Sequence, residues 1–310
     1  MTLTHFDDAR RREIEIGHLH ATWSFLGEAA GSQGIGVRRI EVAPGGWSTP
    51  AHEHGREEEI FYVLGGRGLA WHAGNTYEIG AGDCVVFRPA RGAHSVHALE
   101  PLDTLAFGPR LDDESVGFPR IGFSLVGGRG VETVPGVRDG YAVQFVREAD
   151  AGPPELPPPS PRPAWIVNVA DVEGESRDGP TVARRRRDLA RAAGSVRTGL
   201  KVYEAAPGKL ATPPHCHSAE EELFVVLDGD GHLLLGDEEH PVQRGHVVAR
   251  PPGTGVAHTF RAGDRGLTFL AYGTRESNDI CFYPRSGKVF FRGVNLVARI
   301  ESLDYWDGEE

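Results

Sequence analysis

Short segments in which apolar and polar residues alternate, or in which apolar residues run together, recur along the whole chain. Glycine, proline and charged residues separate these segments at intervals of about 8–12 residues, which is the pattern of an all-β sandwich or barrel. The expected strands of the first half are Val37–Val42, Ile60–Leu64, Gly68–His72, Asn75–Ile79, Asp83–Arg88, His94–Ala98 and Leu102–Phe107. Their connections are too short for crossover helices, so we predict antiparallel pairing.

The same pattern returns in the second half of the chain at a constant offset, which indicates an internal duplication. Gly36 matches Gly199, and at the same offset Ala43-Pro44-Gly45 matches Ala206-Pro207-Gly208. The expected strands of the second copy are Leu200–Glu204, Gly231–Leu235, Glu239–Val242, His246–Arg250, His258–Arg261 and Leu267–Tyr272. Between the copies, Gly152–Pro163 is dominated by proline. Such a run is stiff and extended, so we predict a linker there.

These features predict two all-β domains in tandem, with short helical segments. We expect an N-terminal arm over residues 1–25, a first barrel over 26–150, a linker over 151–163 and a second barrel over 164–310. A chain of 310 residues is long enough for each domain to bury its own core. Arg184–Arg187 is expected to lie in a short helix whose charges face solvent or the other domain.

The charge balance narrows the range of partners. Lysine and arginine number 33 against 44 acidic residues, and the formal net charge of −11 disfavours nucleic acids and anionic membranes as partners. No apolar run approaches the roughly 20 residues that span a bilayer, and the N-terminus lacks a secretory signal, so we expect a cytoplasmic protein. The three cysteines Cys84, Cys216 and Cys281 are expected to be reduced thiols.

A histidine pair followed by a glutamate carries the clearest chemistry. His52 and His54 are two positions apart, so on a strand their side chains point to the same face, about 6–7 Å apart along the chain. Glu59 follows at an odd spacing, and the polar segment 55–58 must turn the chain to bring its carboxylate to the same side. The second copy repeats this arrangement with His215, His217 and Glu222. Each group suits one divalent metal ion.

A later histidine supplies a fourth candidate ligand in each copy. His94 follows His54 at nearly the same distance along the chain as His258 follows His217. With these residues, the two halves resemble cupin domains, whose motifs are Gly-x5-His-x-His-x3–4-Glu-x6-Gly and Gly-x5-Pro-x-Gly-x2-His-x3-Asn. The first motif runs from Gly46 to Gly66 in the first copy, and the second copy departs from it by one position before His215.

The second motif departs further from the cupin pattern in both copies. Gly82 lies one position further from Pro89 than is usual, Arg91 stands where glycine is usual, and Ala98 and Ala262 replace the usual asparagine. These departures concern the loop around the motif, because the terminal histidine is present in each copy. The resemblance covers roughly residues 26–110 and 189–275.

The resemblance implies a bicupin, with two jelly-roll barrels and a metal ion at the open centre of each. It assigns one ion to His52, His54, Glu59 and His94, and the other to His215, His217, Glu222 and His258. Three imidazoles and one carboxylate suit Fe, Mn, Ni, Cu or Zn. Glu59 and Glu222 are also the candidate catalytic residues, either as permanent ligands or as bases that accept a proton.

The leading hypothesis is a metal-dependent, dioxygenase-like oxidoreductase that acts on a small oxygenated or carboxylated organic molecule. The resemblance equally admits a metal-dependent decarboxylase, isomerase or hydrolase, or a metal-stabilised binding or structural protein without turnover. We expect apolar side chains in phase with the glutamates to line the barrels, namely Phe61, Val63, Phe224 and Val226. Barrels of this kind commonly pair, so we expect packing within the chain or a homo-oligomer.

Two further sets of charged residues have open roles. Arg110 and Arg275 lie at similar places in the two copies and either make structural ion pairs or face an acidic substrate. The glutamate pairs Glu57-Glu58 and Glu220-Glu221 are candidate proton donors, but we expect them to lie in exposed turns.

Overall fold

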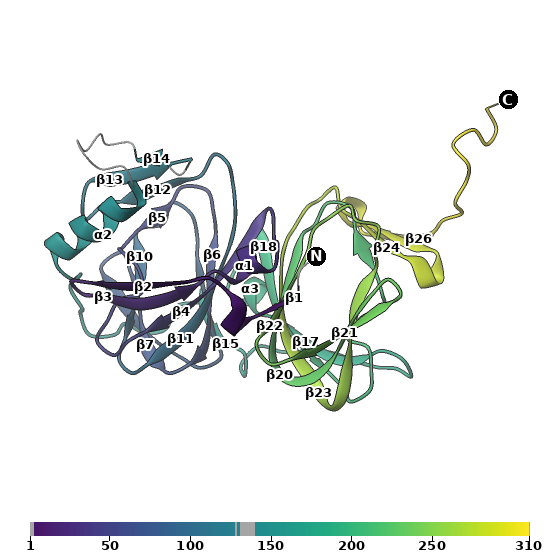
Figure 1. The fold of residues 1–310 in the computed structure, drawn as a ribbon, viewed down its shortest axis with the longest axis horizontal. Helices are drawn as coiled ribbons and strands as arrows, with labels where there is room; N and C mark the ends of the chain where they lie inside the picture. The colour runs from purple at the N-terminus through teal and green to yellow at the C-terminus, as the bar shows by residue number, and fades with distance from the viewer. Residues whose placement is uncertain (1–2, 128, 131–139, 310) are drawn as a thin grey trace.

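Two β-rich lobes stand side by side in the computed structural model, which describes residues 3–127, 129–130 and 140–309 (Figure 1). The helices are short, apart from α2 (Gly140–Ala151), which follows the first lobe. The others are α1 (Leu26–Ala29), α3 (Leu189–Ala192), η1 (Phe6–Asp8), η2 (Pro284–Ser286) and η3 (Arg292–Val294).

The first lobe is built from three antiparallel sheets. A seven-stranded sheet has the order β15-β9-β6-β11-β4-β3-β2, a three-stranded sheet the order β10-β7-β8, and a four-stranded sheet the order β14-β13-β12-β5. Their strands are β2 (Arg11–Ile16), β3 (Leu19–Ser24), β4 (Ile35–Val42), β5 (Glu53–His54), β6 (Glu59–Gly65), β7 (Arg67–His72), β8 (Asn75–Gly80), β9 (Asp83–Phe87), β10 (His94–Ala98), β11 (Leu102–Pro109), β12 (Ser115–Phe118), β13 (Phe123–Val126), β14 (Arg129–Gly130) and β15 (Ile166–Asn168).

The second lobe repeats this plan with longer strands. Its eight-stranded sheet follows the order β1-β22-β20-β23-β18-β17-β16, with β21 paired to β20, and a four-stranded sheet has the order β19-β24-β25-β26. The strands are β1 (Leu3–His5), β16 (Glu175–Asp178), β17 (Ala183–Asp188), β18 (Thr198–Ala205), β19 (Cys216–His217), β20 (Glu222–Leu235), β21 (Glu238–Gln243), β22 (His246–Arg250), β23 (His258–Thr274), β24 (Ile280–Tyr283), β25 (Lys288–Phe291) and β26 (Leu296–Arg299).

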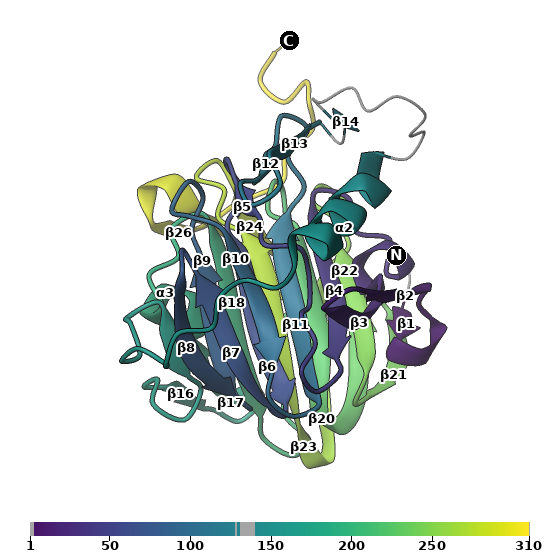
Figure 2. The same cartoon turned by 90° about the vertical axis from the view of Figure 1, so that its left-hand side faces the viewer.

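The predicted all-β, jelly-roll fold class is confirmed, and the predicted strands are present in both halves. In the second lobe β23 joins two predicted strands into one continuous element. Within the described residues the sheets do not close into hydrogen-bonded barrels. In the second lobe the interior core is formed almost entirely by residues of the eight-stranded sheet. Figure 2 looks along the pair of lobes from the side of the first.

The two lobes exchange their first strands. β1 pairs with β22, with Leu3 opposite Val248, and β15 pairs with β9, with Ile166 opposite Val85. The two pairs are equivalent in the repeat, since Leu3 corresponds to Ile166 and Val85 corresponds to Val248 at the same offset. The sheets therefore do not follow the boundaries predicted at residues 25 and 163, because each lobe begins with a strand that belongs to the other.

Along each of the central strands β6 and β20, successive side chains point alternately into two different cores. Phe61 and Val63 belong to the interior core of the first lobe, and Phe224 and Val226 to that of the second, as predicted. The intervening residues of the same strands, Ile60, Tyr62, Leu223 and Val225, lie in a third core that contains residues of both lobes. The expected packing of the two barrels within the chain is thus built from the outer faces of β6 and β20.

Three segments refine the predictions from sequence. Arg184–Arg187 lies on strand β17 rather than in a helix, because this segment repeats the place of β3 beside the central strand β18. Residues 11–24, predicted as part of an arm, form β2 and β3 of the first lobe. The proline-rich segment runs along the first lobe, where Arg162 pairs with the buried Asp83 at 2.6 Å.

Among the described residues no helix has both the length and the apolar character to cross a bilayer.

Candidate metal centres

Backbone pairing brings the first and last histidines of each predicted set together. His52 and His94 form an isolated antiparallel bridge, with His52 N–H donating to His94 O at 3.1 Å and the reverse bond at 2.8 Å. His215 and His258 form the same bridge in the second lobe. Residues directly opposite in an antiparallel pair project their side chains to the same face, so each bridge places two imidazoles side by side.

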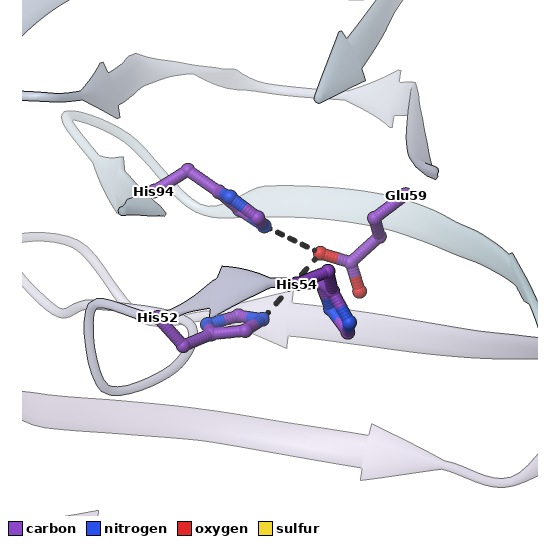
Figure 3. A group of neighbouring side chains, drawn as sticks. All are labelled: His52, His54, Glu59 and His94. Carbon is purple, nitrogen blue, oxygen red and sulfur yellow. Dashed lines mark hydrogen bonds and ion pairs between the residues drawn. The ribbon is translucent and has the colours of Figure 1, made fainter. Parts of the chain in front are cut away.

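The glutamate reaches these imidazoles because the chain turns before β6. Residues 55–58 follow β5 and are not part of a strand, and β6 begins at Glu59. Its Oε2 lies 2.9 Å from His94 Nε2 and 3.7 Å from His52 Nε2. Figure 3 shows the four side chains of the first centre pointing toward one another from three separate segments. One ligand atom from each of His52, His54, Glu59 and His94 lies within 4.8 Å of the others.

The second centre is less compact. Glu222 Oε2 lies 2.9 Å from His258 Nε2, 3.4 Å from His217 Nε2 and 4.0 Å from His215 Nε2. Three of the predicted ligands, His215, Glu222 and His258, form one group within 4.8 Å. His217 belongs instead to two other groups within the same distance limit, one with His215 and Cys281 and one with Glu220 and Asp279.

Two of the candidate ligands in the first centre, His94 and Glu59, have protonation states that suit cation binding. Burial lowers the pKa of His94 to about 3, so this imidazole is neutral. Burial by itself raises the pKa of Glu59, but the nearby imidazoles of His52 and His94 outweigh it and hold that pKa well below its usual value. Neutral imidazoles and an ionised carboxylate are the states in which these side chains ligate metals.

Backbone carbonyls fix which imidazole nitrogen faces the centre. His52 Nδ1–H donates to Pro50 O at 2.9 Å, and His215 Nδ1–H donates to Pro213 O at 2.8 Å. In each ring the Nε2 lone pair is thereby left for a ligand bond. His217 Nε2 and both ring nitrogens of His54 are buried without a hydrogen-bond partner among the described residues. Buried polar atoms of this kind normally have a partner, and a metal ion bound at these centres would supply one.

A second carboxylate lies beside the middle histidine of each set, and sequence reasoning missed it. Glu114 Oε1 lies 3.5 Å from His54 Nδ1, and Asp279 Oδ2 lies 2.7 Å from His217 Nδ1. Glu114 also accepts the backbone N–H of Gly55 at 2.8 Å, which fixes the turn before β6. The signal was present in the sequence, because Glu114 is related to Asp279 by the same offset that relates Arg110 to Arg275.

The predicted exposed turns are buried, which corrects that expectation. The exposed fractions of Glu58, Glu220 and Glu221 are 1%, 6% and 4%. Glu57 and Glu220 lie beside the centres, with an oxygen 3.8 Å from His54 Nδ1 and 3.9 Å from His217 Nδ1 respectively. Burial raises the pKa of Glu57, and raises that of Glu220 to about 7.

The remaining glutamates and the paired arginines have structural partners. Glu58 and Glu221 face the boundary between the lobes and accept hydrogen bonds from the opposite lobe. Arg110 Nη1 donates to Ser32 O at 3.0 Å, and Arg275 Nη1 donates to Ser195 O at 2.9 Å. These contacts support the structural role for Arg275, whose Nη2 also lies 3.7 Å from Asp188, whereas Arg110 lines a cavity beside the first centre and keeps both roles open.

Two cavities adjoin the first centre. One has a volume of about 390 Å³ and is lined by the side chains of His52, His54 and Glu59 together with apolar groups such as Phe118 and Leu125. The other, of about 290 Å³, shares His54 and Glu59 with it. Arg38 and Glu57 line both cavities. A concave site with apolar walls and a few convergent polar groups is the usual form of a small-molecule site.

Comparison with known proteins supports this description of the two lobes. The cupin domain model matches residues 38–107 and 201–271, and the starts of these segments differ by the offset of the repeat. Germin-like protein 3-1 of Oryza sativa subsp. japonica is 38% identical over 82 residues, which is 25% of this chain and 34% of that protein. The chain thus spans about a third of the length of this curated relative.

Solved structures of similar fold span nearly the whole chain. Oxalate decarboxylase from Bacillus subtilis at pH 4.6 superposes with a TM-score of 0.58 at 17% identity, over 87% of this chain and 75% of that one. Oxalate decarboxylase from Lactobacillus farciminis, as a formate complex, gives 0.56 at 18% identity, over 88% and 86%. Another structure of the Bacillus subtilis enzyme, with a TM-score of 0.58, describes Mn(II) centres. At these identities the likeness shows the shared fold.

Proposed function

Because the chain carries two cupin domains in tandem and so belongs to the cupin superfamily, we propose that it is a metal-dependent enzyme acting on a small organic carboxylate in its first lobe. Each lobe holds one divalent transition-metal ion, among Fe, Mn, Ni, Cu and Zn. In the first lobe the ion is held by His52, His54, Glu59 and His94. The leading reaction is a dioxygenase-like oxidation, and decarboxylation is the second candidate.

The observation that carries this proposal is the placement of Arg38. On strand β4 it shares a face with Ile40 and Val42, which belong to the interior core of the first lobe. Its guanidinium carbon lies 5.3 Å from the ring centre of Trp23 and 5.6 Å from that of Phe25. Among the described residues it has no acidic partner, although it lines both cavities beside the metal ligands.

A guanidinium held in this way is suited to a carboxylate ligand. Two aromatic rings restrict its movement, and the planar fork of N–H groups matches the two oxygens of a carboxylate. The charge is positioned before the substrate arrives, so little ordering of this side chain is needed on binding. We therefore assign to Arg38 the recognition of the substrate carboxylate and to the metal centre the recognition of a second oxygen.

The second lobe differs at two matching positions, which is why the proposal places the reaction in the first. Lys201 occupies the place of Arg38, and Arg292 occupies the place of Gly127, which lines the larger cavity. Arg292 pairs with Glu220 and lies 3.7 Å from Asp279. The second lobe thus has a long charged side chain at a position where the first lobe has a glycine.

When bound, the ion supplies a Lewis acid with open positions for a substrate oxygen or for dioxygen. The chain's own residues then bind the carboxylate through Arg38 and exclude water through the apolar wall that includes Phe118 and Leu125. Decarboxylation is kept as a candidate on a specific observation. A decarboxylase must deliver a proton to the carbon that loses CO2, and Glu57 is an acid that lines both cavities.

The test is turnover of a panel of small mono- and dicarboxylates by protein loaded with Fe(II) or Mn(II). Oxygen uptake supports the dioxygenase-like reaction, and CO2 release without oxygen consumption supports decarboxylation. H54A should abolish turnover while H217A retains it, because only the first lobe carries the cavity with Arg38. Binding of carboxylates by fully loaded protein without any turnover would instead support a non-enzymatic binding protein, and would overturn the proposal.

A further inference from the structure

A cysteine enters the second metal centre at a position where the first centre has an apolar residue. Cys281 lies on β24, directly opposite His217 of β19. In the first lobe Val116 of β12 lies opposite His54 of β5 in the same register. The offset between Val116 and Cys281 is the one that also relates Glu114 to Asp279. The repeat therefore places a cysteine in the second centre at the position where the first centre has a valine.

The thiol lies within reach of the centre. Ligand atoms of His215, His217 and Cys281 lie within 4.8 Å of one another. The cysteine is free and its exposed fraction is 2%. His217 Nε2 is buried and has no hydrogen-bond partner among the described residues, while Nδ1 of the same ring lies 2.7 Å from Asp279. One nitrogen is thus held by a carboxylate, and the other is left for a ligand bond.

The neighbouring residue completes the difference between the lobes. Tyr283 replaces Phe118 in the repeat, and its ring stacks on His215 at 5.7 Å as that of Phe118 lies 6.0 Å from His52. Tyr283 and Cys281 are two positions apart on β24, so their side chains point to the same face of the strand. The second lobe thus presents a phenol and a thiol where the first lobe presents a phenyl ring and an isopropyl group.

We propose that Cys281 is a metal ligand in the second lobe, together with His215 and His217, and that the two lobes consequently differ in metal preference. On binding, the S–H bond breaks, the proton passes to solvent and a metal–sulfur bond forms. A site with imidazole and thiolate donors favours thiophilic ions such as Zn(II). The first lobe, with three imidazoles and a carboxylate and no thiol, is suited to harder ions such as Mn(II). This inference rests on the metal binding proposed above for the second lobe.

The test uses cobalt(II) as a spectroscopic probe in the full chain. With the first centre disabled by H54A, one equivalent of cobalt should bind and give the intense near-ultraviolet charge-transfer band of a cobalt–thiolate bond. C281S should lose this band while it still folds, as judged by circular dichroism. C216S is the matched control, since Cys216 is also buried on the same pair of strands but belongs to none of the candidate ligand groups. It should retain the band.

Two results would overturn the inference, and they are distinguishable. Stoichiometric cobalt in H54A without a thiolate band would remove Cys281 from the centre and leave metal binding by the second lobe intact. No cobalt in H54A would remove the second metal site altogether, and with it this inference. In a converse experiment, V116C in the H217A background should create a thiolate band in the first lobe, because it places a sulfur at the matching position.

Discussion

The hydroxyl group of Ser195 donates a 2.7 Å hydrogen bond to the carboxylate of Glu58 across the boundary between the two lobes. Both side chains are buried, and the carboxylate also accepts the backbone N–H groups of Val196 and Arg197 at 3.0 and 3.1 Å. The repeat makes the equivalent contact in the opposite direction, since Glu221 accepts the N–H of Gly34 at 2.6 Å. Two reciprocal contacts, which we call anchors, thus join the lobes through Glu58 and Glu221. Each of these glutamates lies one residue before a central strand, β6 or β20.

Removal of one anchor should destabilise both lobes together. In E58A several donors of the second lobe lose a charged acceptor in a buried place, and we expect a loss of about 3 kcal/mol in the free energy of unfolding. The measurement is thermal or urea unfolding followed by circular dichroism. E41A is a suitable control, because Glu41 makes ion pairs at the surface with Arg11 and Arg39. A variant E58A as stable as the wild type would contradict the role given to this contact.

The outer carboxylates should control metal affinity one lobe at a time. D279N removes the charge that holds His217, and we expect the affinity of the second centre to fall about 10- to 100-fold. E114Q should do the same to the first centre through His54. Calorimetric titration of metal-free protein with Mn(II) or Zn(II) resolves the two sites. If either substitution weakened both centres equally, the carboxylates would act through overall stability rather than through one histidine.

The sequence could predict which candidate ligands lie close together because the repeat presents each of them twice. A single His-x-His pair is weak evidence, but His52 and His215 each recur with a glutamate and a later histidine at matching spacing. Strand alternation likewise predicts which side chains line the interior, as Phe61 and Phe224 do. These features are local, since they depend on the period of a strand and on spacing along the chain.

Features that depend on contacts between distant segments could not be predicted in this way. The exchange of β1 and β15 joins segments on opposite sides of the predicted boundaries, and no local pattern indicates the partner of so short a strand. Glu58 is a charged residue in a polar run, so its composition favours an exposed turn. Its burial follows from the donors around Ser195, which lies in the other half of the chain.

Substitution of Arg38 should affect substrate recognition more than the metal centre. Loss of a charge-assisted, bidentate contact is worth about 1.5–3 kcal/mol, so R38A should lower kcat/KM for the carboxylate substrate about 10- to 100-fold. Metal content should be unchanged, because Arg38 is not a ligand. Steady-state kinetics and elemental analysis measure the two quantities.

The adjacent residue offers a matched control for that experiment. Arg39 lies on the opposite face of β4 and pairs with Asp103 at 2.8 Å, away from the cavities. R39A removes the same charge from the same strand and should leave kcat/KM close to that of the wild type. Equal losses in R38A and R39A would indicate a long-range effect of charge and not a contact with substrate.

The thiols of the metal-free native protein should resist alkylation at pH 8. Burial raises the pKa of Cys84 and Cys216, and raises that of Cys281 to about 12. A pKa near 12 leaves about one Cys281 side chain in 10⁴ as thiolate at pH 8, and the thiolate is the reactive form. Because the pKa is raised, the reactive fraction should grow about tenfold with each pH unit above 8. Mass spectrometry after iodoacetamide treatment should find no label in native protein and three after denaturation in guanidinium. Rapid labelling of protein with an unchanged circular dichroism spectrum would show that these thiols are accessible to the reagent. It would contradict their burial in the structure, on which this prediction depends.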